Sequence, residues 1–172
     1  MGRLIGLSLL TLVLLIVGVH SCDTSPARMA ERLLLADINA EDGLAYRDAQ
    51  QQRPEIATLP SGLQFEVLSP GQGAIPEPDD WVEVHYRGWH IDGREFASSW
   101  REDQPATVAI SKTIAGWREA LIMMPVGTRV RLILPPNLAY GRSGGGAIGP
   151  EETLVFELEL RAIVATPEVV GF

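Results

Sequence analysis

The stretch that decides the fold reads WVEVHYRGW, from Trp81 to Trp89. In an extended chain Val82, Val84 and Tyr86 point to one side, and the polar residues between them point to the other. Asp92-Gly93 follows directly and is a typical hairpin turn. The stretch therefore predicts a strand that turns back on itself to form an antiparallel pair.

Further strands and one short helix surround this first strand. Alternating apolar residues predict strands at 63–68, 107–110, 128–134 and 153–164. Residues 115–123 carry a helical pattern, with Trp117 and Leu121 one turn apart. A glycine-rich loop, residues 140–150, separates the last two strands. We therefore predict an α+β domain in which an antiparallel β-sheet wraps around one short α-helix.

A helical N-terminal segment, residues 22–58, precedes this domain. Ser25-Pro26 is typical of a helix start, and Pro54 of a helix end. Asn39 and Gly43 are expected to weaken the middle, so the segment is read as one or two loosely amphipathic helices. The segment is interpreted as a solvated tether, and its alternative role is dimerisation. The apolar residues at helical spacing are Met29, Leu33, Leu34 and Ile38.

The N-terminus, residues 1–21, has the pattern of a secretory signal. Arg3 is followed by an apolar run that is shorter than the roughly 20 residues of a membrane-spanning helix. The run ends at Val19-His20-Ser21-Cys22, which resembles the lipobox of bacterial lipoproteins. We expect cleavage before Cys22 and acylation of this cysteine, which would anchor the chain to a membrane of the bacterial cell envelope, facing the periplasm. The alternatives are an uncleaved anchor, or an ordinary signal with an incidental cysteine.

The composition argues against several classes of function. The 172 residues carry a net charge of −8, which becomes −9 when Arg3 leaves with the signal, and Lys112 is the one lysine. Phosphate binding needs clustered basic residues, so a nucleic-acid partner is not expected. One cysteine forms neither an internal disulfide nor a cysteine-rich metal site. His85 and His90 have no spaced partners and are interpreted as surface or structural residues. We expect no metal and no cofactor.

Several stretches together resemble the FKBP-type peptidyl-prolyl isomerases. The likeness covers about residues 59–165, and LPSGLQ at 59–64 is similar to the lead-in of the secreted bacterial branch, the macrophage infectivity potentiator type. It implies an FKBP-like fold for 59–165, with 166–172 as a C-terminal tail. It also implies isomerase activity on proline-containing polypeptides, assisting the folding of exported proteins. The motifs, in the family's order, are VHYRG at 84–88, DGREFASS at 92–99, IAGWREAL at 114–121, PVG at 125–127, AYG at 139–141 and TLVF at 153–156.

The resemblance also implies a site, because the family's motifs assign pocket positions to residues of this chain. The pocket acts through apolar walls and a few hydrogen bonds. The implied catalytic residues are Tyr86, Phe96, Trp117, Tyr140 and Phe156. The implied substrate-binding residues are Val108, Thr113, Ile114 and Ile148, with the backbone N–H of Ile114 bonding a substrate carbonyl.

Three positions depart from the family's pattern. Ala97 stands where an acidic residue is usual, and Glu102 stands where its basic partner is usual. The loop ends in Ile148-Gly149-Pro150, where Ile-Pro-Pro is usual. We expect these changes to lower isomerase activity and the binding of macrolide immunosuppressants. The alternative reading is a catalytically weak binding module or chaperone on the same scaffold.

Overall fold

The computed structural model describes residues 25–101 and 103–165. Within them, seven strands form one antiparallel sheet in the order β1-β2-β6-β7-β3-β4, and β5 also pairs with β3. The predicted signal, Cys22, Glu102 and the tail 166–172 lie outside the described residues. The strands are β1 (Ala57–Thr58), β2 (Gln64–Ser69), β3 (Trp81–His90), β4 (Glu95–Ser98), β5 (Ala106–Ala109), β6 (Arg129–Leu134) and β7 (Leu154–Val164).

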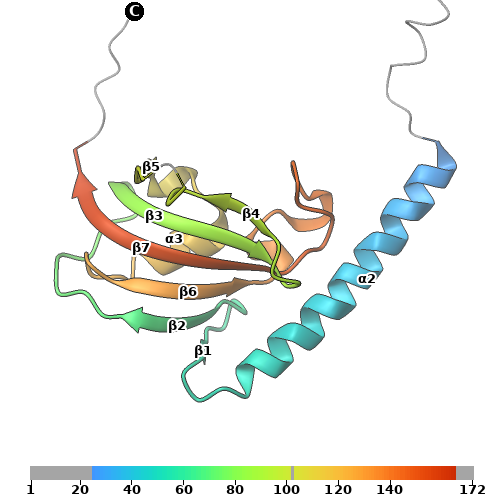
Figure 1. Ribbon diagram of the computed structural model, residues 1–172, viewed down its shortest axis with the longest axis horizontal. Coiled ribbons are helices and arrows are strands. Elements are labelled where there is room, and N and C mark those ends of the chain that lie inside the picture. Colours follow the sequence, from blue (N-terminus) through green and yellow to red (C-terminus); the bar gives the residue numbers. More distant parts are fainter. Residues whose placement is uncertain (1–24, 102, 166–172) are drawn as a thin grey trace, which may run out of the picture. The chain divides into compact units, whose positions relative to one another are not determined.

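The long strands β3 and β7 form the middle of the sheet. They pair from Trp81 opposite Val164 to His90 opposite Leu154, with one register shift at 83–84. Figure 1 shows the sheet curving around the short helix α3 (Ala115–Leu121). Strands that are amphipathic on one face and a helix with an apolar side bury those surfaces against each other. The predicted α+β architecture, an antiparallel sheet wrapped around one short helix, is confirmed.

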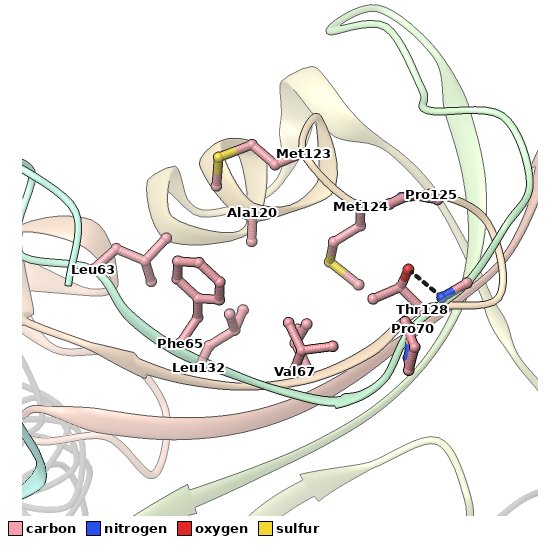
Figure 2. Close-up of a pocket in the computed structure, with 12 residues that line it drawn as sticks. Leu63, Phe65, Val67, Pro70, Ala120, Met123, Met124, Pro125, Thr128 and Leu132 are labelled. Carbon is pink, nitrogen blue, oxygen red and sulfur yellow. Dashed lines mark hydrogen bonds between the residues drawn. The ribbon is translucent and has the colours of Figure 1, made fainter. Parts of the chain in front are cut away.

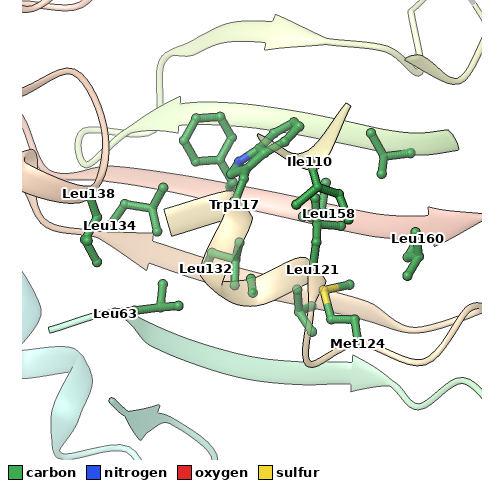
Figure 3. Close-up of a cluster of buried hydrophobic side chains, with 14 of the residues drawn as sticks. Leu63, Ile110, Trp117, Leu121, Met124, Leu132, Leu134, Leu138, Leu158 and Leu160 are labelled. Carbon is green, nitrogen blue, oxygen red and sulfur yellow. The ribbon is translucent and has the colours of Figure 1, made fainter. Parts of the chain in front are cut away.

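The core lies between the sheet and α3 (Figure 3). Leu121 from α3, Leu132 from β6 and Leu158 from β7 are almost completely buried. Burying each such side chain contributes roughly 1.5–3 kcal/mol to folding. The core therefore fixes α3, which carries Trp117, against β6 and against β7, which carries Phe156.

The predicted strands and helix agree with the observed elements to within two residues at each end. Val67 is an exception in burial. Alternation along 63–68 puts Leu63, Phe65 and Val67 on one side of the strand, but the side chain of Val67 is 50% exposed. It lies toward the end of β2, where it borders an open groove that the core does not fill. The short strand β1 has no sequence pattern of its own, whereas β4 is the antiparallel partner that the Asp92-Gly93 turn predicts.

Helix α2 (Pro26–Gln51) is the helical N-terminal segment that the sequence predicts. The backbone N–H of Arg28 donates to Ser25 Oγ at 3.4 Å, so Ser25 caps the helix start as expected. Residue contacts place the chain up to Leu34 in one unit and the chain from Leu35 onward in another. Among residues 25–101 and 103–165, no helix combines the length and the apolar character needed to cross a membrane.

Asn39 and Gly43 do not interrupt α2, so the segment forms one helix. Gly43 is buried, and a Cβ atom placed on it would lie 2.4 Å from Thr153 Oγ1. The helix is therefore continuous because its polar and small residues contact the sheet domain, which offsets their low helix propensity. The apolar side chains of Ile38 and Leu44 remain 46% and 52% exposed.

Candidate active site

Four aromatic side chains from four different elements meet at one side of the core. Tyr86 comes from β3, Phe96 from β4, Trp117 from α3 and Phe156 from β7. Their ring centroids lie 5.2 Å apart for Tyr86–Trp117, 5.5 Å for Trp117–Phe156 and 5.6 Å for Phe96–Phe156, all edge-on. This is the preferred arrangement of aromatic pairs. The structure therefore brings together four of the five residues predicted as catalytic.

The aromatic cluster has a buried side and an accessible side. Trp117 and Phe156 are 7% and 3% exposed, whereas Tyr86 and Phe96 are half-buried. Gly88 of β3 makes room for the rings, because a Cβ atom there would lie 2.6 Å from Phe96 Cζ and 2.9 Å from Phe156 Cε1. In the described part of the chain, no hydrogen-bond acceptor reaches the buried Trp117 Nε1.

The predicted substrate-binding residues lie beside this cluster or against the same core. Ile114 is the N-cap residue of α3 and packs half-buried on the core. Its backbone N–H donates to none of the residues 25–101 and 103–165, so it is available to a carbonyl. Thr113 donates its hydroxyl to Ile110 O at 2.8 Å and so supports the preceding turn. Val108 packs half-buried on the same core from β5.

The flap loop, residues 140–150, carries the last two predicted residues. Ile148 is 8% exposed and belongs to the core cluster, whereas Tyr140 is 41% exposed. Gly145 and Ile148 exchange two backbone hydrogen bonds, of 2.9 and 3.0 Å, which close the loop tip. The flap loop therefore has one apolar residue packed inward and one tyrosine accessible to solvent.

The sequence of residues 73–161 matches the family described as FKBP-type peptidyl-prolyl cis-trans isomerase. This chain belongs to that family. The match spans β3 to β7, which carry the whole aromatic cluster and the flap loop. The fold and the collinear motifs lead to the same assignment.

Several FKBP-type proteins of known sequence or structure are similar to this chain. The Outer membrane protein MIP of Legionella longbeachae is 43% identical over 82% of this chain and 61% of its own length. The FKBP-type 22 kDa peptidyl-prolyl cis-trans isomerase of Escherichia coli K12 is 45% identical, over 73% of this chain and 61% of its own. The crystal structure of FkpA from Escherichia coli is 34% identical, with a TM-score of 0.78 over 81% of this chain and 65% of that one. The chain thus spans less than two thirds of the length of the curated relatives it matches.

The candidate site differs from the family's pattern at Ala97. Ala97 is half-buried on β4, opposite Gly88 of β3 and next to Phe96. The nearby Arg101 pairs with Glu95, at 2.5 Å between Nη2 and Oε1. The aromatic cluster therefore has no carboxylate from position 97 beside it, and the adjacent basic residue is already paired elsewhere.

Sequence reasoning did not predict the pairing of His90 with Glu152, which lies next to the aromatic cluster. His90 is buried, and its Nδ1 lies 2.6 Å from Glu152 Oε2, while its ring meets Phe96 edge-on at 5.2 Å. The two residues are far apart in sequence, so no local spacing pairs them. Within the described ranges, no group of three or more His, Cys, Asp or Glu residues is placed to hold a metal ion. His90 packs inside the fold and pairs with Glu152.

An apolar groove outside the FKBP-type site was also missed by sequence reasoning. Figure 2 shows it between β2, β6 and the end of α3. Its cavity volume is about 230 Å³. It includes Val67 and Met123, which are 50% and 45% exposed. It shares no residue with the aromatic cluster or the flap loop. In the sequence its lining residues Met123-Met124-Pro125 form a short apolar run with no pattern that marks a groove.

Proposed function

We propose that this chain is a peptidyl-prolyl cis-trans isomerase that assists the folding of exported proteins. The observation that carries the proposal is the edge-on cluster of Tyr86, Phe96, Trp117 and Phe156, with a buried floor and accessible walls. An X–Pro bond isomerises over a barrier of roughly 18–20 kcal/mol, because the amide loses its resonance as it twists. The twisted amide has less charge separation than the planar one, so apolar walls favour it over the ground state.

Each residue has a proposed role in that reaction. Trp117 supports the proline ring from below, and Tyr86, Phe96 and Phe156 enclose it. The backbone N–H of Ile114, which has no acceptor among the described residues, receives a substrate carbonyl. The hydroxyl of the exposed Tyr140 donates to a second carbonyl. Val108, Thr113 and Ile148 shape the edges. The chemistry needs no covalent intermediate, metal or cofactor.

A protease-coupled assay on a short Xaa-Pro peptide tests the proposal. The mature soluble chain, residues 23–172, should accelerate cis-to-trans conversion, and Trp117→Phe should lower kcat/KM while keeping the protein folded. Val67→Ala, which borders the separate apolar groove, serves as the control and should keep full activity. An unaccelerated conversion by the folded wild-type chain would contradict the proposal.

We also propose that residues 1–21 are a lipoprotein signal and that Cys22 anchors the mature chain to a membrane of the bacterial cell envelope. The support is the apolar run and the lipobox-like Val19-His20-Ser21-Cys22. A lipoprotein cysteine carries a diacylglycerol on its thiol and a further acyl chain on its amino group. Three acyl chains anchor a protein stably to a membrane, whereas a single chain binds only marginally. Cys22→Ser should abolish labelling by a radioactive fatty acid and release the chain from membranes. Labelling that persists in this variant would refute the anchor.

Residues 22–58 are proposed as a tether between that anchor and the isomerase domain at 59–165, with a homodimer as the second possibility. The observation that favours a dimer is the exposure of apolar residues on α2. Met29, Leu33 and Leu34 are 58%, 65% and 62% exposed, and a paired helix would cover them. Sedimentation of residues 23–172 distinguishes the two: a tether gives a monomer, and a dimer should dissociate in Leu33→Glu.

A further inference from the structure

We propose that Asn39 of α2 is a positioning residue for the flap loop and, through it, for the isomerase site; the second step rests on the proposed function. The side-chain amide of Asn39 donates from Nδ2 to the carbonyl oxygen of Pro150 at 2.7 Å. Both residues belong to the unit that begins at Leu35. Asn39 lies outside the range 73–161 that matches the family model, so the family's motifs do not include this contact.

The contact reaches the flap loop where it joins the aromatic site. Pro150 is buried and lies two residues after Ile148, which belongs to the same buried core cluster as Trp117 and Phe156. A helix that holds the Pro150 carbonyl therefore limits how far Ile148 can move from the cluster. The Gly145 N–H donates to the Ile148 carbonyl at 2.9 Å, so a shift of Ile148 would also expose the Gly145 amide to exchange.

Gly149, one of the departures from the family's pattern, is what permits the contact. A Cβ atom on Gly149 would lie 2.7 Å from Glu152 Oε1 and 3.2 Å from Asn39 Nδ2. A proline ring there would occupy the same space and would also lack the backbone N–H, which donates to Glu152 Oε1 at 2.9 Å. A glycine at position 149 therefore leaves room for the Asn39 and Glu152 side chains, and it supplies an N–H that proline would lack.

The Glu152 carboxylate also holds the end of the flap loop, through contacts other than those of Asn39. One carboxylate oxygen accepts the Gly149 N–H, and the other lies 2.6 Å from His90 Nδ1. The His90 ring in turn meets Phe96 of the aromatic cluster. The end of the flap loop is thus held between α2 on one side and an aromatic wall of the site on the other.

Gly43 allows α2 to pack close to the segment that follows the flap loop. It lies about one helical turn after Asn39, and its Cα side packs against Thr153, the residue after Glu152. A larger residue would push the helix away and lengthen the Asn39–Pro150 bond. The two residues that weaken a helix in isolation are therefore the two that bring this helix to the flap loop.

Amide hydrogen exchange on the mature chain tests the positioning directly. In Asn39→Ala and in the isosteric Asn39→Asp, which has no amide donor, exchange at Gly145 and Ile148 should rise about two- to tenfold, the effect of losing one hydrogen bond. Amides of β6 and β7 should keep their protection. Glu41→Ala, an exposed change on the same helix, is the matched control and should leave the flap loop unchanged.

A double-mutant cycle with Gly149→Pro gives the second readout. If Asn39 acts through this segment, Gly149→Pro should raise exchange at Gly145, and adding Asn39→Ala should change it little further. In the isomerase assay Asn39→Ala should raise KM and leave kcat nearly unchanged, because flap contacts bind rather than react. Unchanged flap exchange, or fully additive effects, would overturn the proposal. If the wild-type chain is inactive but the Asn39 variants still raise exchange in the flap loop, the isomerase function is refuted and the positioning of the flap loop by Asn39 is supported.

Discussion

The indole of Trp117 and the ring of Phe156 meet edge-on, with centroids 5.5 Å apart and planes 84° apart. Both rings belong to the buried core as well as to the candidate site. Replacing either one therefore removes stability together with any activity, since truncating a buried aromatic costs about 3–5 kcal/mol. Residues at the edge of the cluster separate the two effects more cleanly.

Tyr140→Phe tests a hydroxyl at that edge. Tyr140 is 41% exposed, so removing its oxygen should change the free energy of unfolding by less than about 0.5 kcal/mol. If the hydroxyl donates to the substrate, kcat/KM should fall about two- to tenfold, the loss of one hydrogen bond. Tyr46→Phe removes a hydroxyl from α2 and is the control with unchanged activity. Equal kcat/KM for wild type and Tyr140→Phe would exclude the assigned role.

Gly88→Ala tests whether the two phenylalanine rings need the space beside β3. The added Cβ atom would lie 2.6 Å from Phe96 Cζ, so the rings must move and the free energy of unfolding should fall by about 1–3 kcal/mol. Urea denaturation measures this change. Gly145→Ala, whose Cβ atom would lie 3.4 Å from Tyr140 Cδ1, should destabilise the fold far less. Similar stabilities for the two variants would show that Gly88 is not needed for ring packing.

Ala97→Asp tests the cost of the missing carboxylate. An ionised side chain beside Phe96 would restore the charge that is usual at this position, and Arg101 is already paired with Glu95. We expect kcat/KM to rise about three- to tenfold, equivalent to roughly 1 kcal/mol of transition-state stabilisation. Ala97→Asn, which has nearly the same shape without the charge, should stay near wild type. A rise in both variants would attribute the gain to shape instead of charge.

Trp100→Ala tests the outer face of the sheet, which faces away from the aromatic cluster. Trp100 stacks on His85, with centroids 5.2 Å apart, and the guanidinium groups of Arg87 and Arg129 lie 5.2 and 5.4 Å from its ring. Its loss should lower the free energy of unfolding by about 1–3 kcal/mol. Isomerase activity of the folded fraction should be unchanged. A selective loss of activity would place Trp100 in the site.

The regular strands and α3 could be predicted because their burial follows a local period. Val82 and Val84 are fully buried, and Tyr86 lies on the same face, as alternation requires. The aromatic site could be predicted through resemblance, since each motif has a fixed place on the scaffold. The role of Gly88 is a packing constraint that becomes visible only when Phe96 and Phe156 are in place.

The contacts of α2 could not be predicted, because they join residues far apart in the sequence. Helix propensity is a local property, and by that measure Asn39 and Gly43 are weak points. Asn39 contributes a hydrogen bond to Pro150, and Gly43 allows close packing against Thr153. No local sequence pattern connects these pairs. The pairing of His90 with Glu152 was missed for the same reason. Gly149 could be recognised as a departure, but not as the residue that admits Asn39.

The rate of cis–trans exchange in a short Xaa-Pro peptide, measured by NMR without a coupling protease, tests the central claim most directly. Uncatalysed exchange takes tens to hundreds of seconds. The mature chain at catalytic concentration should accelerate it in proportion to protein concentration, and Trp117→Phe should accelerate it less at equal folded concentration. An exchange rate that stays at the uncatalysed value at every concentration of folded wild-type chain would contradict the isomerase function.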